Sequence, residues 1–504
     1  MLHRHRSRLA LTALLLIVSV TARAETLGLF TDHNDIGEVK HAGTAAFDAA
    51  TGTYTIGGSG ANMWFAKDNF HYIWKKVSGD VALTATFDSI TQGTEGHRKG
   101  LLMLRQSLDT DSAYIDVARH ADGLTSLQFR DAKGAITREI QTSVVGPQRL
   151  RLDKIGDTAY LSVGDAGGNL VPTGCSAHIA LTGEYYIGLG VCAHNADEFV
   201  TVAFSHVEIS APSNAPAAIR SIIEAIPMPS GDRRALYATN DLIEAPNWAR
   251  DGSALIFNGG GRLHSLALGK LPDGKPILAG DGRPTPIDTG TRMKCNNDHG
   301  LSPDGTQLAI SDQSKGGKSR IYLLPLTGGT PKEITPNAPS YWHGWSPDGA
   351  TLAYCAQRNG KFGIFTIPAA GGEEQRLTTT DGLDDGPDYS PDGQWIYFNS
   401  DRSGLMQIWR THPDGSAIQQ LTRDDYNNWF AHPSPDGKWI VFLTFARDVK
   451  GHPRDKDVML RVMPAGGGDI SVVVKLFGGQ GTMNVSSWSP DSSRIAYVRY
   501  QPEK

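Results

Sequence analysis

The chain has 504 residues, of which 39% are hydrophobic and 20% are charged, and its formal net charge is −5 at pH 7. With 57 glycines and 27 prolines, this composition is typical of a folded protein with many turns, and it excludes disorder, coiled coil and collagen. The mildly acidic balance argues against nucleic acid as a ligand.

The first 24 residues have the composition of a secretory signal peptide. Arginines precede an apolar run over residues 9–20, and the small-residue cleavage pattern Ala22-Arg23-Ala24 follows it. The apolar run is too short to span a bilayer, and no later segment of the sequence reaches the roughly 20 apolar residues of a transmembrane helix. The sequence therefore predicts a protein that is periplasmic or secreted after cleavage of residues 1–24 and that does not span a membrane.

Residues 25–210 contain many short runs in which apolar and polar side chains alternate, such as residues 81–87. A period of two is typical of half-buried strands, so this segment is predicted to form one β-sandwich. Cys175 and Cys192 lie within it, and they either pair as a disulfide after export or remain buried thiols. Residues 211–218, which are rich in Ala, Pro and Ser, are a predicted linker.

Residues 219–504 contain a repeated turn. The string Ser-Pro-Asp-Gly, or a close relative, begins at serines separated by 44, 44, 44 and 55 residues, namely Ser302, Ser346, Ser390, Ser434 and Ser489. A degenerate copy begins at Ala249. Alternating runs follow each turn, and a four-stranded unit of this length is typical of a propeller blade, so the repeat predicts six blades. The turn aspartates are equivalent in every unit, and they are predicted to bond the backbone rather than to catalyse.

The closure of the ring is predicted from the two ends of this segment. The chain ends two strands into the sixth unit, which would leave an open edge. Two further strand-like runs, at residues 221–228 and 234–239, precede the first turn. They are predicted to be the outer strands of the last blade, so that strands from both ends of the propeller segment close the ring.

The Ser-Pro-Asp-Gly turns, each followed by an apolar strand, resemble the repeats of TolB-type six-bladed β-propellers over about half of the chain. Residues 98–107 and 186–195 are similar to segments of concanavalin A-like jelly rolls of the lectin and glucanase kind. The resemblance implies an all-β chain, with a concanavalin A-like β-sandwich over residues 25–210 followed by a six-bladed TolB-like β-propeller over residues 219–504. TolB itself carries an α/β domain in front of its propeller, through which it engages the Tol machinery, so a sandwich in that place argues against the same role.

The start of the first strand in each blade is the predicted ligand site, because in propellers of this kind that strand borders the central channel. Polar and aromatic side chains are found there in the second to sixth units, namely Asn297, Asp298, His299, Tyr341, Trp342, His343, Asp384, Asp385, Asp388, Asn428, Trp429, His432 and Asn484. The alternative is that these side chains only satisfy strand ends and trapped water.

Aromatic faces beside polar groups suit a sugar, whose C–H face stacks while its hydroxyls exchange hydrogen bonds. The fifth unit has an insert over residues 447–457 that is predicted to cover the mouth with His452, Arg454 and Lys456. Such a basic insert would favour an anionic sugar, such as a uronic acid, unless it is simply a solvated loop.

A divalent metal is the cofactor that these residues could hold. His299, His343 and His432, together with carboxylates, would suit Zn, Mn or Ca. The sequence has no local ligand spacing for a metal, and ligands scattered over several blades would leave none, so the metal is neither supported nor excluded.

Three functions remain open from the sequence. The first is an exported carbohydrate-binding protein, with its ligand at the propeller mouth and a second site on the sandwich face near Trp64, Trp74, Arg105, His120, Arg130 and His194. The second is a glycoside hydrolase, with Asp385 paired with Asp298 or Asp388 as its two carboxylates, or a polysaccharide lyase, with His299 or His343 as its base. The third is a TolB-like envelope scaffold with a protein partner.

Overall fold

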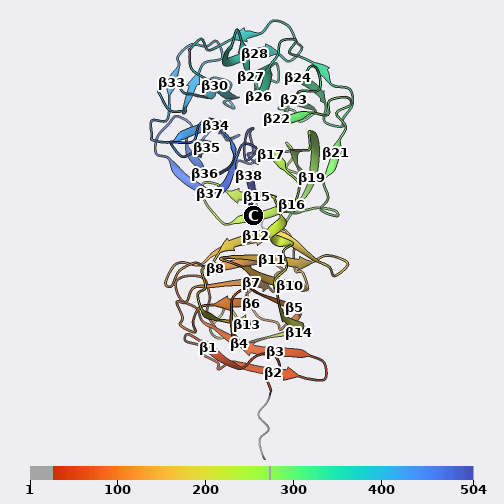
Figure 1. Cartoon of the computed structure of the whole chain (residues 1–504), viewed down its shortest axis with the longest axis vertical. Helices are drawn as coiled ribbons and strands as arrows, with labels where there is room; N and C mark the ends of the chain where they lie inside the picture. The colour runs from red at the N-terminus through yellow and green to blue at the C-terminus, as the bar shows by residue number, and fades with distance from the viewer. Residues whose placement is uncertain (1–25, 272–273, 503–504) are drawn as a thin grey trace, which may run out of the picture.

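The structure is a computed structural model that describes residues 26–271 and 274–502. The strands form two lobes, an amino-terminal lobe of β1–β14 and a propeller of β15–β38 (Figure 1). One short 3-10 helix, η1 (Pro216–Ala218), lies on the segment that joins them. The predicted signal peptide lies outside the described residues. Within the described ranges, no helix is both long enough and apolar enough to cross a membrane.

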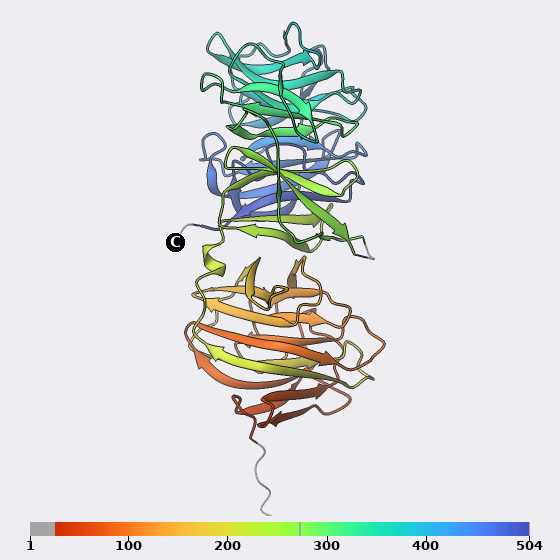
Figure 2. The ribbon, with the colours of Figure 1, turned by 90° about the vertical axis from the view of Figure 1, so that its right-hand side faces the viewer.

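Two stacked sheets make the amino-terminal lobe, and Figure 2 shows them from the side. The first contains β1 (Asp32–Ile36), β4 (Phe70–Ser78), β13 (Glu184–Cys192), β6 (Lys99–Arg105), β7 (Tyr114–His120), β8 (Thr125–Arg130) and β9 (Arg138–Thr142). The second contains β12 (Leu170–His178), β11 (Thr158–Gly164), β10 (Arg149–Ile155), β5 (Val81–Ile90), β14 (Val200–Ser210), β3 (Thr53–Gly58) and β2 (Thr44–Asp48). The sequence predicts these strands from their alternation, because every second side chain enters the core between the sheets.

Strand β6 illustrates this alternation. Leu102 and Leu104 belong to the core between the two sheets, whereas Leu101 and Met103 belong to a separate cluster on the opposite face of the first sheet. Met63 completes that second cluster, so the segment that contains it lies over the outer face of the sheet. This outer face is therefore covered by the chain itself.

Two arginines that the sequence suggested for a sugar-binding face hold this covering segment instead. Arg130 is fully buried and donates to both carboxylate oxygens of Asp68, at 2.9 and 2.7 Å. Arg105 lies 3.5 Å from the same carboxylate. A buried charge requires such pairing, so these side chains are committed to structure.

All four cysteines are buried free thiols. Of the two alternatives for Cys175 and Cys192, the structure therefore shows thiols. Burial raises the pKa of Cys175 to about 12, which keeps it protonated and unreactive.

In the part of the propeller that the structure describes, five sheets of four or five strands are arranged around a common centre (Figure 1). The first contains β17 (Ile243–Trp248), β18 (Ala254–Gly259), β19 (Arg262–Lys270), β20 (Pro276–Leu278) and β21 (Thr285–Ile287). The second and third contain β22 (Cys295–Leu301), β23 (Gln307–Asp312), β24 (Arg320–Pro325) and β25 (Lys332–Glu333), then β26 (Ser340–Trp345), β27 (Thr351–Arg358), β28 (Lys361–Pro368) and β29 (Gln375–Arg376). The fourth and fifth contain β30 (Asp384–Tyr389), β31 (Ile396–Ser400), β32 (Gln407–Thr411) and β33 (Gln419–Gln420), then β34 (Asn427–Pro433), β35 (Trp439–Phe445), β36 (Arg454–Pro464) and β37 (Ser471–Gly479).

The repeated turn has the structural role that its sequence predicts. In the second sheet, Ser302 donates its hydroxyl to Asp304 Oδ1 at 2.5 Å, and Asp304 Oδ1 accepts from the backbone N–H of Thr306 at 3.0 Å. The same serine hydroxyl accepts from Gln307 N at 3.0 Å. The turn aspartate is thus saturated by local donors, as an Asx turn requires.

Both ends of the propeller segment meet in one sheet, as the sequence predicts. β15 (Ser221–Pro227) pairs antiparallel with both β16 (Arg233–Thr239) and β38 (Arg494–Tyr500). β16 also pairs in parallel with β9 of the amino-terminal lobe, which makes a ten-stranded sheet that runs through both lobes. The backbone ladder therefore links the two lobes directly.

The blade count differs from the predicted six four-stranded blades. The propeller contributes three strands, β15, β16 and β38, to the sheet that closes the ring. In place of the expected fourth, inner strand, the structure has a single β-bridge between Trp488 and Ile495. The preceding residues bond through side chains instead of a ladder. Gly481 N donates to Asn484 Oδ1 at 2.7 Å, and the Ser487 hydroxyl donates to Pro246 O at 2.6 Å. Such side-chain bonds compete with strand pairing.

Candidate functional site

The site is built on the innermost strand of each of the five sheets. The register of each inner strand with its neighbour shifts at the same place, within residues 244–247, 295–299, 342–344, 385–388 and 429–432. A β-bulge bends a strand and redirects its side chains. Because the five bulges are equivalent, they turn side chains from five sheets toward one channel.

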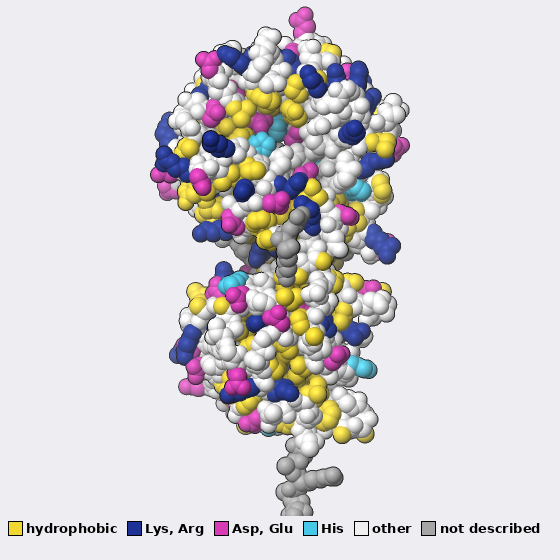
Figure 3. All heavy atoms as spheres, viewed as in Figure 1, with side chains coloured by type: hydrophobic (Ala, Val, Ile, Leu, Met, Phe, Trp, Pro, Cys, Tyr) yellow, Lys and Arg dark blue, Asp and Glu magenta, His cyan; other side chains and the backbone are white. Residues whose placement is uncertain are grey.

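A cavity of about 450 Å³, here called the mouth cavity, opens where the inner strands begin. It is lined by Glu244, Asn296, Asn297, Asp298, Gln313, Tyr341, His343, Cys355, Phe362, Leu383, Asp385, Phe430, His452, Gln480 and Asn484. Of the residues that the sequence singles out, it brings together Asn297, Asp298, Tyr341, His343, Asp385, His452 and Asn484. Figure 3 shows histidine and acidic side chains within the hollow at the centre of the propeller.

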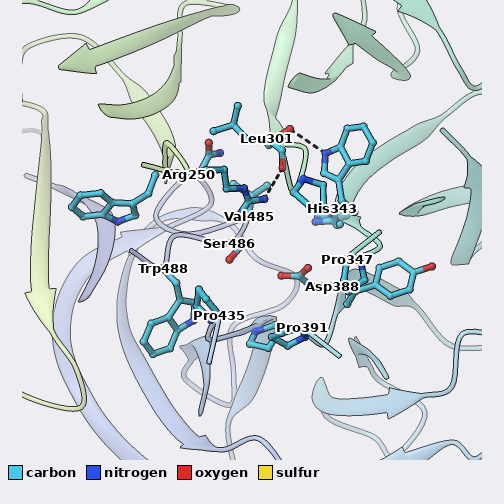
Figure 4. Close-up of a pocket in the computed structure, with 18 of the residues that line it drawn as sticks. Arg250, Leu301, His343, Pro347, Asp388, Pro391, Pro435, Val485, Ser486 and Trp488 are labelled. Atoms are coloured by element: carbon cyan, nitrogen blue, oxygen red, sulfur yellow. Dashed lines mark hydrogen bonds between the residues drawn. The ribbon is translucent and has the colours of Figure 1, made fainter. Parts of the chain in front are cut away.

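A second cavity, here called the channel cavity, lies at the other end of the inner strands. The prolines of the repeated turns surround it, and it has a volume of about 270 Å³ (Figure 4). His299, Trp342 and Asp388, which the sequence assigned to the mouth, line this cavity instead. His343 lines both cavities and so stands between them.

The other predicted site residues lie in neither cavity. Asp384 accepts from Arg402 Nη2 at 2.8 Å and from the Thr380 hydroxyl at 2.9 Å. Asn428 is fully buried and accepts from Arg461 Nη2 at 2.6 Å. These contacts hold neighbouring strands together.

His432 and Trp429 have supporting positions. His432 is fully buried, and its Nδ1 lies 2.9 Å from Asp388 Oδ2. The ring of Trp429 packs edge-on against His452, with centroids 4.5 Å apart. Each of these residues therefore touches a residue that lines a cavity.

The predicted metal ligands do not share one cavity. His299 and His343 both line the channel cavity, and His343 also lines the mouth cavity, whereas His432 lines neither. Across residues 26–271 and 274–502, no group of three or more His, Cys, Asp or Glu side chains has an arrangement that could hold a metal ion.

Asp385 is the centre of an ionic group in the mouth cavity. Its Oδ1 lies 3.4 Å from His343 Nε2, and its Oδ2 lies 3.8 Å from His452 Nε2. Burial alone would raise the pKa of Asp385, but the hydrogen bond and charge of His343, with the charge of His452, outweigh burial and lower it to about 2. Burial would lower the pKa of His343, and Asp385 and Asp298 outweigh that effect and raise it.

Asp298 lines the same cavity, and its pKa is shifted in the opposite direction. Burial is the largest influence on it and raises its pKa to about 7, although His343 pulls in the other direction. Its Oδ2 accepts from Asn296 Nδ2 at 2.7 Å. The cavity therefore contains one carboxylate that stays ionised and one carboxyl that holds its proton up to neutral pH.

The remaining wall combines amides with aromatic rings. Gln480 Oε1 contacts His452 Nδ1 and accepts from Asn484 Nδ2 at 3.2 Å. The Phe430 ring stacks on His343 with centroids 5.8 Å apart. These contacts hold the wall side chains in place around the cavity.

The insert of the fifth unit contributes less positive charge than its sequence suggests. His452 does line the mouth cavity, but Arg454 Nη1 lies 3.5 Å from Glu244 Oε1, so a neighbouring carboxylate offsets its charge. Lys456 is not among the lining residues. The wall of the mouth cavity is therefore not basic.

Glu244 and Gln480 are lining residues that the sequence did not single out. Glu244 stands five residues before the degenerate turn at Ala249, as Asp385 stands five residues before Ser390. Glu244 could therefore have been found from the sequence by counting back five positions from every turn. Gln480 lies in a loop that has no fixed spacing from a turn, so the sequence gives no signal for it.

Comparisons with known proteins agree with the propeller. A family model described as TolB beta propeller domain matches residues 301–454. A protein of Agrobacterium fabrum that is described as uncharacterized is 50% identical over 284 residues, which are 56% of this chain and 94% of that protein. The structure of putative TolB from Agrobacterium tumefaciens is 50% identical, with a TM-score of 0.54, over 56% of this chain and 99% of that one. TolB from Acinetobacter baumannii is 14% identical, with a TM-score of 0.38, over 70% of this chain and 82% of that one.

Proposed function

This chain belongs to the TolB-like β-propeller family, and from that premise we propose that its mouth cavity binds a small carbohydrate. The observation that carries the proposal is the wall of the cavity. Amide and carboxyl groups from several sheets line it together with the rings of Tyr341 and Phe430. Sugar hydroxyls both donate and accept hydrogen bonds, and their C–H faces pack on aromatic rings, so this wall suits a sugar.

A neutral sugar fits the wall better than a uronic acid does. Glu244, Asp298 and Asp385 all line the cavity, and the imidazolium of His343 is already beside Asp385. An added carboxylate would therefore have no free cation to pair with, because His343 already contacts Asp385. The insert of the fifth unit does not change this balance, because Arg454 lies against Glu244.

Binding of glycans by the mature full-length chain tests the proposal. A glycan array identifies the ligand, and calorimetry then compares the wild type with Asp385→Asn and Tyr341→Ala. Each change removes a wall group, so we expect affinity to fall by about tenfold or more.

The matched control is Asp392→Asn, because Asp392 lies on the same blade in the exposed turn and outside both cavities. It should keep the wild-type affinity. Absence of glycan binding, or equal affinity in all three variants, would refute the proposal, and capture of an envelope protein at the mouth would support the scaffold function instead.

Hydrolysis of a glycoside is the second candidate function, and the split protonation of the two aspartates favours it. A protonated carboxyl beside an ionised carboxylate is the pairing that glycosidases use as acid and as base or nucleophile. Asp298 would be the acid and Asp385 the base or nucleophile. Burial would lower the pKa of His343, but Asp385 and Asp298 outweigh burial and raise it, which disfavours this ring as the base of a lyase.

Release of nitrophenolate from a panel of nitrophenyl glycosides tests hydrolysis. Asp298→Asn removes the acid, so we expect the rate to fall by about a hundredfold or more. No turnover by the wild type, or full turnover by this variant, would leave binding as the function of the cavity.

We also propose the finer features of the architecture and location. The strands β16, β15 and β38, with the bridging segment at Trp488, make a sixth blade. The amino-terminal lobe is a concanavalin A-like domain over residues 25–210, joined by residues 211–218 to the propeller over residues 219–504. Residues 1–24 direct export, and amino-terminal sequencing of the protein recovered from the periplasm checks this point.

A further inference from the structure

The channel cavity is separate from the mouth cavity and has a polar interior inside an apolar rim. The rim consists of the prolines of the repeated turns together with the rings of Trp248, Trp345, Tyr389 and Trp488. In Figure 4 the carboxylate of Asp388 and the hydroxyl of Ser486 project into the space that this rim encloses. The proposed sugar site does not use these groups.

Several buried polar atoms on the wall have no protein partner. They include Asn247 Oδ1, Trp248 Nε1 and Trp342 Nε1, and all of these residues line the channel cavity. Each buried polar group that is left unpaired has lost its hydrogen bonds to water without replacement, which is unfavourable. A group of such atoms around one cavity therefore indicates a polar occupant.

The wall offers both donors and acceptors to that occupant. Burial lowers the pKa of His299 to about 4, so its ring is neutral, and the backbone of Ile256 and Asn297 bonds it in place on this wall. Asn247 donates its Nδ2 to His299 O at 3.0 Å, which leaves Oδ1 as an acceptor. The indole N–H of Trp342 is a donor without a protein partner, and His343 on the same wall has a pKa that Asp385 and Asp298 raise against the effect of burial, which favours the form with two N–H donors.

Opposite full charges also line the cavity. Asp388 Oδ2 accepts from the His432 ring. The other carboxylate oxygen, Oδ1, has space around it because Gly344 has no side chain. A Cβ at Gly344 would lie 3.0 Å from Asp388 Oδ1. Arg250 comes from a different blade and donates Nε to Ser302 O at 3.0 Å and Nη2 to Leu301 O at 2.7 Å. Figure 4 shows Arg250 and Asp388 on different sides of the ring.

We propose that the channel cavity binds a small zwitterion with one ammonium and one carboxylate group, such as a free α-amino acid. The ammonium group donates to Asp388 and to Asn247 Oδ1, and the carboxylate accepts from Arg250 and from the imidazolium N–H of His343. A simple amine would leave the donors of the wall unpaired, and a simple carboxylate would face Asp388. The indole rings of the rim favour the ammonium end further through cation–π attraction.

Titration of the mature full-length chain with single L-α-amino acids at millimolar concentration tests this proposal. Tryptophan fluorescence is a direct readout, because Trp248, Trp345 and Trp488 line the cavity. For each amino acid that binds, the matching decarboxylated amine and deaminated acid are titrated in parallel. We expect both to bind at least about tenfold more weakly than the zwitterion.

Two variants locate the site. Asp388→Asn removes the partner of the ammonium group, and Gly344→Ala places a methyl group against Asp388, so each should weaken amino-acid binding by about tenfold or more. Tyr341→Ala changes the mouth cavity alone and should leave amino-acid affinity unchanged, which separates this inference from the proposed sugar site.

The inference is overturned if no amino acid binds, if the truncated probes bind as tightly as the zwitterion, or if both variants keep the wild-type affinity. Thermal unfolding of each variant shows whether it folds. If Asp388→Asn does not fold, the Gly344→Ala titration decides.

Discussion

Asp298 and Asp385 show how burial and neighbouring charge act on one residue type. Both line the mouth cavity, yet burial dominates at Asp298 and raises its pKa to about 7, while His343 and His452 dominate at Asp385 and lower its pKa to about 2. The difference depends on which carboxylate the imidazoles touch. The opposite pKa shifts of two aspartates in one cavity follow from these two imidazole contacts with Asp385.

The two aspartates should therefore affect stability with opposite pH dependence. Asp298 has a raised folded pKa, so its stabilising contribution is complete below its ordinary value of 3.8 and is lost as the pH rises through about 7. Asp298→Asn removes this loss. We therefore expect the difference in the free energy of unfolding, variant minus wild type, to increase by on the order of 3 kcal/mol from pH 4 to pH 8. Urea unfolding at several pH values measures it.

Asp385→Asn is the comparison for that measurement. Asp385 has a lowered folded pKa, so its contribution is present above 3.8 and is lost as the pH falls through about 2. This variant should be less stable than the wild type at pH 7, with a smaller difference below pH 4. Parallel pH profiles for both variants would contradict the assignment.

At the scale of the element, the bulges of the inner strands decide which side chains reach the channel. Gly386 in β30 has a φ of 61°, and Phe430 in β34 has a φ of 55°. A Cβ at Gly386 would lie 2.8 Å from Asn399 Oδ1 and 2.9 Å from Phe430 Cδ1. Glycine is therefore required there both for its backbone conformation and for the close approach of the next blade.

Gly386→Ala should destabilise the propeller more than the same substitution at a glycine in an open turn does. Gly437 has a φ of 71°, and a Cβ there would meet no atom within 4 Å beyond its chain neighbours, so Gly437→Ala carries the backbone cost alone, about 1–2 kcal/mol. Gly386→Ala adds the clash, and we expect a further loss of about 1–3 kcal/mol. Thermal or urea unfolding compares the two, and equal losses would mean that the bulge adapts without strain.

At the scale of the whole molecule, one buried carboxylate joins the two ends of the propeller segment. Glu224 in β15 is fully buried and accepts from the Tyr497 hydroxyl at 2.7 Å and from Arg499 Nε at 3.0 Å, both in β38. Arg499 also donates to Gly174 O of the amino-terminal lobe at 2.8 Å. Ring closure and contact between the lobes therefore share one network.

Glu224→Ala should weaken this closure strongly. The change leaves Arg499 and Arg233 without their buried partner, which costs about 3–5 kcal/mol. The control is Glu333→Ala, because the Glu333–Lys315 pair is partly exposed and should contribute about 1 kcal/mol or less. Calorimetry of the full chain compares the two variants, and a similar small loss in both would show that the network does not hold the ring together.

The sequence by itself determined the elements of this protein. Period-two alternation predicted strands throughout, and the turns at Ser302, Ser346, Ser390 and Ser434 predicted four successive sheets, because both signals are local and repeat with each unit. It also predicted that β15 and β38 would meet, since an open ring edge is unfavourable.

Only the tertiary structure decided which polar residues share a cavity. Asp384 and Asp385 are neighbours in the sequence, yet one bonds Arg402 while the other lines the mouth cavity. Glu244 and Gln480 join Asp385 there from distant parts of the chain. The reason is that successive side chains of a strand point to opposite faces and a bulge changes that order, so the composition of the site depends on bulge geometry and on packing between blades.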